Sequence, residues 1–150
     1  MPYFNTSGAG GGETLVTFVN KAPQATIKVC KLIDPGSVTP IGGKSFTFKI
    51  WSPSPSGNTL LTSGSVSPPY PGPASCVLLG SYPVQQDDGT PTKLLVGEVA
   101  QNGVQVQSIT LNGNATVNTN NVNSNGKINF TLTGPGVIVL VFTNAATPPN

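Results

Sequence analysis

The chain has 150 residues, enough for one domain with a substantial core, and it carries little charge. Seven lysines stand against five acidic residues, which gives a net charge of +2, and there is no arginine and no histidine. Nucleic-acid binding is therefore not expected, because the chain lacks both a basic stripe and an arginine for bidentate contacts. Without histidine or a C-x-x-C motif we expect no metal site and no cofactor. No apolar run is long enough to span a membrane.

The composition favours a secreted β-protein. The chain contains 18 glycines and 15 prolines, which argues against long helices. Most of its polarity comes from asparagine, threonine and serine, and little comes from charged side chains. We therefore expect the protein to be extracellular or at the cell surface.

Residues 1–24 are predicted to be an N-terminal tail that carries one strand at residues 14–20. The glycine-rich residues 8–12 have the composition of a flexible linker. The strand at 14–20 has apolar side chains on both faces, namely Leu15, Val16, Phe18 and Val19. Like the end of the chain, it combines an aliphatic run with a phenylalanine two residues before an asparagine. The segment thus resembles the last strand of a domain, but no domain precedes it in the sequence.

The main domain is expected to occupy residues 25–145, followed by a short tail at 146–150. Its strands alternate apolar and polar residues with a period of two, and Asn-Gly and Asp-Pro-Gly signals mark its turns. The predicted strands are residues 26–32, 45–51, 76–84, 92–100, 104–111, 127–133 and 137–144, with 59–62 as an eighth, short candidate. Seven to eight short strands predict an all-β fold, an antiparallel immunoglobulin-like β-sandwich, with the N-terminal strand as an extra element.

Two stretches have a weaker strand pattern. Residues 52–75 are rich in proline, serine and glycine, and residues 118–126 form an asparagine-rich hairpin. A long segment of weak structure is either functional or a solvated insertion. We interpret residues 52–75 as a solvated insertion, with a partner-binding loop as the alternative.

Cys30 and Cys76 are the only two cysteines, so they make one candidate disulfide. In an oxidising compartment the bridge would stabilise the fold by about 4 kcal/mol through loop entropy. The alternative is a pair of unlinked buried thiols.

Three polar residues lie on the apolar side of their predicted strands. Lys31 shares a face with two aliphatic residues of the first strand, Glu98 does so in a late strand, and Asn144 does so in the last one. A buried lysine or glutamate costs several kcal/mol unless it has a partner, so the three side chains are expected to meet. Desolvation would lower the pKa of Lys31, and a neutral amine can attack the side-chain carbonyl of Asn144 while Glu98 moves protons. The product would be an intramolecular isopeptide bond.

The alternative is that Lys31 and Asn144 lie at strand ends, where their polar heads reach water while only their stems are buried. No arrangement in the sequence supports turnover, so the protein is not expected to be an enzyme beyond this single autocatalytic event. Asp87 and Asp88 precede Gly-Thr-Pro and are interpreted as a solvated turn.

The order of these motifs resembles the Cna protein B-type domain of bacterial surface adhesins and pilins. The resemblance covers residues 25–145 and rests on four features: a lysine in the first strand, Phe-x-Phe at 46–48, Leu-x-Val-x-Glu at 94–98, and a closing Phe-Thr-Asn at 142–144. It implies a prealbumin-like sandwich in which the matching Lys31, Glu98 and Asn144 form an isopeptide bond. The turn after the glutamate departs from the family, because residues 100–103 read Ala-Gln-Asn-Gly.

Two functions remain in competition. The first is a structural subunit of an extracellular filament, pilus or adhesin stalk, assembled head to tail when residues 14–20 are donated to a sheet of a neighbouring copy. Its partners would be copies of itself. The alternative is a monomeric secreted binding module for carbohydrate or protein, which would use the proline-rich loop 52–75 or the asparagine-rich hairpin 118–126.

Overall fold

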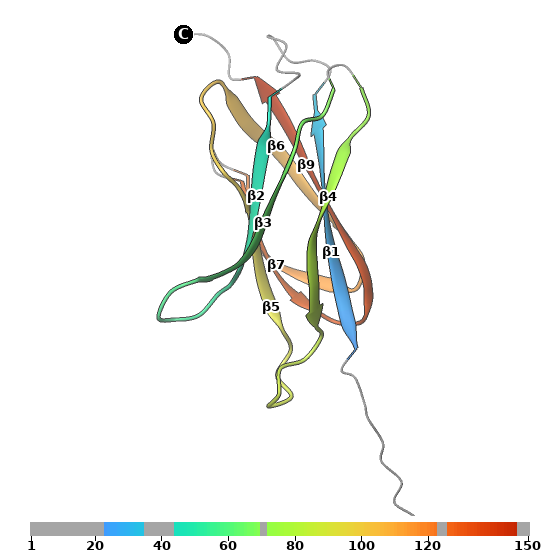
Figure 1. Ribbon diagram of the computed structural model, residues 1–150. Coiled ribbons are helices and arrows are strands. Elements are labelled where there is room, and N and C mark those ends of the chain that lie inside the picture. Colours follow the sequence, from blue (N-terminus) through green and yellow to red (C-terminus); the bar gives the residue numbers. More distant parts are fainter. Residues whose placement is uncertain (1–22, 35–43, 70–71, 123–125, 147–150) are drawn as a thin grey trace, which may run out of the picture.

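A computed structural model describes residues 23–34, 44–69, 72–122 and 126–146 of the chain, and these form nine strands (Figure 1). The strands are β1 (Gln24–Ile33), β2 (Phe46–Ser52), β3 (Thr59–Val66), β4 (Ser75–Pro83), β5 (Lys93–Glu98), β6 (Val104–Asn112), β7 (Ala115–Asn121), β8 (Lys127–Leu132) and β9 (Gly136–Ala146). The described part of the chain contains no helix of the length and apolarity that crossing a bilayer requires. The all-β prediction is confirmed.

The strands form two sheets that pack face to face as a β-sandwich (Figure 1). The four-stranded sheet has the order β4-β1-β9-β6, and the five-stranded sheet has the order β3-β2-β5-β8-β7. The two sheets contain seven pairs of neighbouring strands, and all of these pairs except β1–β9 are antiparallel. The first and last strands of the sandwich therefore lie side by side and run in the same direction.

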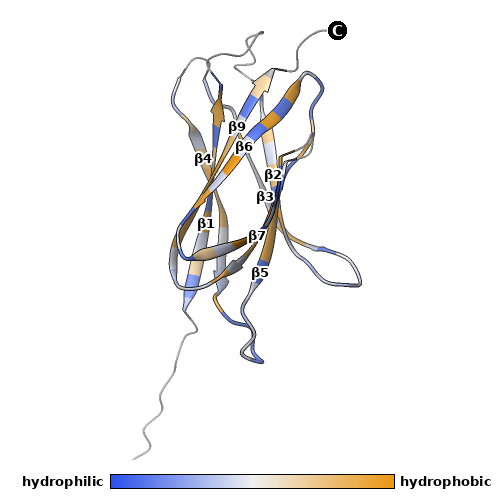
Figure 2. Cartoon of the chain, turned by 180° about the vertical axis from the view of Figure 1, so that it is seen from behind, coloured by the Kyte–Doolittle hydropathy of each residue, from blue (hydrophilic) through white to orange (hydrophobic). Residues whose placement is uncertain are grey.

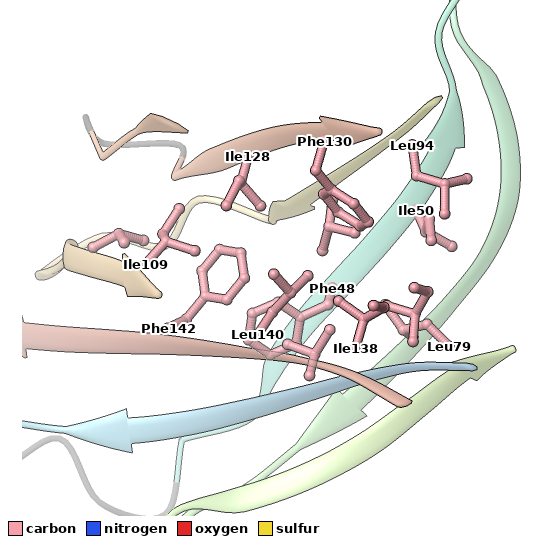
Figure 3. Close-up of a cluster of buried hydrophobic side chains, with 14 of the residues drawn as sticks. Phe48, Ile50, Leu79, Leu94, Ile109, Ile128, Phe130, Ile138, Leu140 and Phe142 are labelled. Atoms are coloured by element: carbon pink, nitrogen blue, oxygen red, sulfur yellow. The ribbon is translucent and has the colours of Figure 1, made fainter. Parts of the chain in front are cut away.

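The core lies between the sheets and follows from the alternation along each strand. Every second residue of β2, β5 and β8 is buried, and Figure 2 shows the same alternation of hydrophobic and hydrophilic positions along β6. Figure 3 shows the inward side chains from both sheets meeting in one cluster, with Phe48, Leu94, Phe130, Leu140 and Phe142 among them. Full burial of such side chains stabilises the fold by roughly 1.5–3 kcal/mol each.

Two strands were missed or underestimated in the sequence. The segment 52–75 is not a long insertion, because β3 fills eight of its residues and pairs along β2. Its serines and threonines are tolerated since β3 is an edge strand and most of its side chains are exposed. The polar stretch that begins near residue 115 also forms an edge strand, β7, which pairs with β8. The antiparallel prediction needs one correction, because β1 and β9 are parallel.

The described strands run from Gln24 at the start of β1 to Ala146 at the end of β9. The predicted strand at 14–20, with Leu15, Val16, Phe18 and Val19, lies outside the described residues, as do the tails at 1–22 and 147–150.

Candidate functional site

Strand alternation carries Lys31, Glu98 and Asn144 to one place between the two sheets. Lys31 is on β1 and Asn144 is on β9, two neighbouring strands of one sheet, where Lys31 pairs with Phe142 and Asn144 with Ile33. The two side chains are therefore diagonal neighbours on the same inner face. Glu98 is the last residue of β5 and comes from the opposite sheet. The site thus joins the two sheets as well as the first and last strands.

The carboxylate of Glu98 connects the other two side chains. Lys31 Nζ donates a hydrogen bond to Glu98 Oε1 and forms an ion pair with it. The side-chain amide of Asn144 donates to the other oxygen, Glu98 Oε2, over 2.5 Å. One carboxylate therefore contacts both the amine and the amide nitrogen. When an amine displaces the nitrogen of an amide, the amine loses protons and the departing nitrogen gains one.

All three residues are removed from water. Lys31 and Asn144 have no exposed surface, and Glu98 is only 6% exposed. The alternative in which their polar heads reach solvent at strand ends is therefore wrong. The reason is that β1 and β9 continue for two residues beyond these positions, and the opposite sheet covers both side chains.

Aromatic rings enclose the amine. Lys31 Nζ lies 4.3 Å from the ring centroid of Phe46 and 5.7 Å from that of Phe48. Phe48 in turn contacts Phe142 edge to face, with ring centroids 4.9 Å apart. These rings exclude water, and their faces also favour the cationic form of the amine. The sequence predicted that Phe46 and Phe48 lie on an apolar face, but not that they surround the Lys31 amine. The Phe-x-Phe pattern was the one feature of the sequence that indicated their shared face.

Burial controls the charge of the amine. Desolvation lowers the pKa of Lys31 to about 8, against an ordinary value of 10.5, while the negative charge and the hydrogen bond of Glu98 oppose this shift. An amine with this pKa is neutral in a far larger fraction of molecules near pH 7 than a surface lysine. A neutral amine is the form that acts as a nucleophile.

The carbonyl oxygen of Asn144 is buried and has no hydrogen-bond partner among the described residues. A buried acceptor without a donor costs roughly 1–3 kcal/mol, so native structures keep few of them and those they keep call for an explanation. Here the unpaired carbonyl belongs to the amide that shares the Glu98 carboxylate with the Lys31 amine. The arrangement therefore combines a desolvated nucleophile, an amide electrophile and a bridging acid–base group.

The predicted disulfide between Cys30 and Cys76 is confirmed. The two residues are directly paired on β1 and β4, and the described residues contain no free cysteine. Cys30 directly precedes Lys31, and adjacent residues of a strand point to opposite faces of its sheet. Lys31 therefore points into the core, while Cys30 points to the other face and forms the bridge. The bridge fixes β1 to β4 at the level of the buried site.

Replacing both cysteines with serine is expected to lower the free energy of unfolding by about 4 kcal/mol, because the bridge closes a loop with a sequence separation of 46. Denaturant titration measures this loss. A reductant should destabilise the wild type to a similar extent and leave the double-serine variant unchanged. Reactive thiols in denatured, unreduced wild-type protein would contradict the bridge.

Other predicted site features lie apart from this cluster. Asp88 accepts hydrogen bonds from the backbone and the hydroxyl of Thr90, which confirms a solvent-exposed turn at that point. The described ranges contain no group of three or more His, Cys, Asp or Glu side chains able to hold a metal ion.

The chain was compared with protein-family models, with curated proteins and with solved structures, and no match was found in any of the three.

Proposed function

We propose that the protein is a structural subunit of an extracellular filament, pilus or adhesin stalk, and that an isopeptide bond between Lys31 and Asn144 locks its sandwich. The observation that carries the proposal is the buried contact of Lys31, Glu98 and Asn144 between the first and last strands. The resemblance of these motifs to the Cna protein B-type domain points the same way. A buried ion pair is by itself weak evidence for stability, so a chemical role explains its presence better.

The bond forms in a sequence of proton transfers through Glu98. Lys31 first gives a proton to the carboxylate, which leaves a neutral amine and a carboxylic acid. The amine then attacks the side-chain carbon of Asn144, and a tetrahedral intermediate forms. Glu98 passes its proton to the departing amide nitrogen and takes one of the two protons on the former amine nitrogen, which keeps the other. The C–N bond of the amide breaks, ammonia leaves, and an amide joins Lys31 to Asn144.

The position of the bond suits a subunit that carries tension. Because β1 and β9 are parallel, the start of β1 and the end of β9 lie at opposite ends of the sandwich (Figure 1). Tension applied at these two ends would pull β1 and β9 past each other. With residues 31 and 144 joined covalently, the force would pass directly from β1 to β9, and the chain between them could not extend.

An extracellular location is part of the same proposal. The disulfide is compatible with an oxidising compartment, where such bridges persist. The scarcity of charge and the abundance of asparagine, threonine and glycine also support it.

Residues 14–20 are proposed to connect the subunits by adding to a sheet of a neighbouring copy. In sequence these residues resemble β9, which lies between β1 and β6. That place is already filled in each chain by its own β9. A donated strand would therefore have to add at an edge of a sheet, where backbone groups are unpaired. Repeated head to tail, such a contact does not close and produces a fibre.

Deleting residues 1–20 is expected to convert an assembly into a folded monomer, because it removes the donated strand. Particle mass by light scattering, measured under native conditions, tests this. Deletion of residues 1–13 alone is the matched control, since it removes the glycine-rich tail but keeps 14–20, and it should leave assembly intact. If the chain without residues 1–20 assembles like the full-length one, strand donation is excluded.

A further inference from the structure

The outer face of the five-stranded sheet carries a second, separate group of polar and aromatic side chains. Register places Lys49 and Lys127 on either side of Gly97 in one row, and Trp51, Leu95 and Asn129 in the next row. Lys93 follows on β5, opposite Thr131 of β8. These residues alternate with the buried ones of β2, β5 and β8, so they point away from the core.

This face is positively charged and has no negative group of its own. The five strands of the sheet contain one acidic residue, Glu98, and it points into the core. Three of the seven lysines of the chain, Lys49, Lys93 and Lys127, lie on the outer side. From strand spacing and rise, Lys49 and Lys127 are separated by about 10 Å, and Lys93 lies about 13 Å further along the strands. Such a spread suits an extended anionic chain better than a single ion.

An aromatic side chain lies within this charged face. Gly97 makes room for it, since a Cβ at that position would lie 3.2 Å from Trp51 Cζ3 and 3.0 Å from Lys127 Cγ. Lys127 Nζ is 5.4 Å from the centre of the indole ring. Trp51 is partly exposed and is the only tryptophan of the chain. An indole ring presents an apolar surface and one polar N–H group, which suits a partner with both C–H and hydroxyl surfaces.

A hollow of about 350 Å³ adjoins this group, at the end of β2. Its lining residues are Pro53, Ser54, Lys93, Asn118, Thr119 and Asn129. Asn118 donates hydrogen bonds to Asn129 Oδ1 and Thr131 Oγ1, which fixes the orientation of two amides that line the hollow. The hollow therefore combines amides, hydroxyls and one lysine, with no carboxylate in its lining. It also brings together the start of the proline-rich segment and the asparagine-rich strand.

We infer that this outer face binds an acidic polysaccharide, with carboxylates of the sugar chain on Lys49, Lys93 and Lys127 and one sugar unit seated in the hollow. Amides and hydroxyls in fixed orientation match the mixed donor and acceptor groups of sugar hydroxyls. The chain has no arginine, the residue that best pairs with phosphate and bases, so nucleic acid fits this face less well. This binding is independent of the isopeptide bond, because the face lies on the other side of the sheet from Lys31, Glu98 and Asn144.

Titration of the full chain with polygalacturonate, followed by tryptophan fluorescence, tests the inference, because Trp51 is the only reporter. Binding is expected, and it should weaken steeply between about 0.01 and 1 M salt, where the Debye length falls from about 30 to 3 Å. Replacing Lys49, Lys93 and Lys127 together by alanine should weaken it at least tenfold. The corresponding triple arginine variant keeps the charges and should retain binding.

Lys28→Ala is the matched control, because Lys28 lies on the outer face of the opposite sheet, and it should leave binding unchanged. Fully methyl-esterified polygalacturonate, which has no charge, should not bind. Polyglutamate and single-stranded DNA should bind at least tenfold more weakly than polygalacturonate. The inference is overturned if polygalacturonate does not bind, if its methyl ester binds equally well, or if polyglutamate or DNA binds as tightly.

Discussion

Replacing Asn144 with alanine is expected to lower the free energy of unfolding by about 5 kcal/mol. The variant has no electrophile, so it loses a cross-link that closes a loop of about 110 residues. The expected loss of about 5 kcal/mol is the loop-entropy estimate for a cross-link of that length. The ion pair between Lys31 and Glu98 remains, so no buried charge is left alone. Guanidinium denaturation with the disulfide intact measures the difference.

Gln105→Ala is the matched control for Asn144→Ala. Gln105 carries the same amide group on β6 and pairs with Ala145, the neighbour of Asn144, but its side chain is exposed. Its replacement should change the free energy of unfolding by less than about 0.5 kcal/mol. If Asn144→Ala costs no more than about 1 kcal/mol, the covalent link is absent from the wild type.

The Asn144→Ala variant should also show a pH dependence that the cross-linked wild type lacks. In the variant Lys31 remains a free amine, with a pKa lowered to about 8 by burial, whereas its value in the unfolded chain is the ordinary 10.5. Between these values the unfolded chain binds more protons than the folded one. The stability of the variant, measured relative to the wild type, should therefore rise as the pH is raised from about 8 to 10.5, and it should be flat below about 8.

The Glu98→Ala variant is expected to be the least stable of the set. It blocks the reaction, because no group remains to move the protons, and it also leaves the Lys31 amine buried among aromatic rings without a counter-charge. Breaking a buried pair in this way costs about 3–5 kcal/mol in addition to the loss of the cross-link. Its free energy of unfolding at neutral pH should therefore lie below that of Asn144→Ala by that amount.

A second replacement separates the two causes. Lys31→Met combined with Glu98→Ala removes the buried charge and keeps an apolar side chain of similar length, so it should recover most of the 3–5 kcal/mol. It should not recover the contribution of the cross-link, and it should therefore resemble Asn144→Ala. If the double variant is no more stable than Glu98→Ala alone, the charge of Lys31 is not the source of the loss.

Much of the sandwich could be predicted from the sequence because its inner strands alternate clearly. The strands that contain Phe46, Leu94 and Ile128 bury every second residue, and that pattern is visible without a structure. The edge strands β3 and β7 were harder to predict, since pairing along one side stabilises them and their own side chains are mostly exposed. The parallel pairing of β1 with β9 depends on how the sheets close, and no local signal records it.

The buried site could be predicted for the same reason that the inner strands could. Lys31, Glu98 and Asn144 each interrupt an apolar face, and a polar residue in that position requires a partner. The sequence could not show which oxygen of Glu98 contacts which nitrogen, or that the Asn144 carbonyl lacks a donor within the described part of the chain. Residues 52–75 and 118–126, which contribute to the hollow, were named for the alternative binding module. The grouping of Trp51 with the three lysines was not predicted, because these residues come from three strands whose register is set only in the folded sheet.

Intact mass of the denatured and reduced protein tests the central claim most directly, because the reaction removes one molecule of ammonia and changes nothing else in composition. The wild type should be lighter than its sequence by the mass of one ammonia, and digestion should yield a branched peptide that joins Lys31 to Asn144. Glu98→Ala and Asn144→Ala should both have the full mass of their sequences. A wild-type protein with the full mass of its sequence would contradict the isopeptide bond and leave Lys31, Glu98 and Asn144 as a non-covalent buried network.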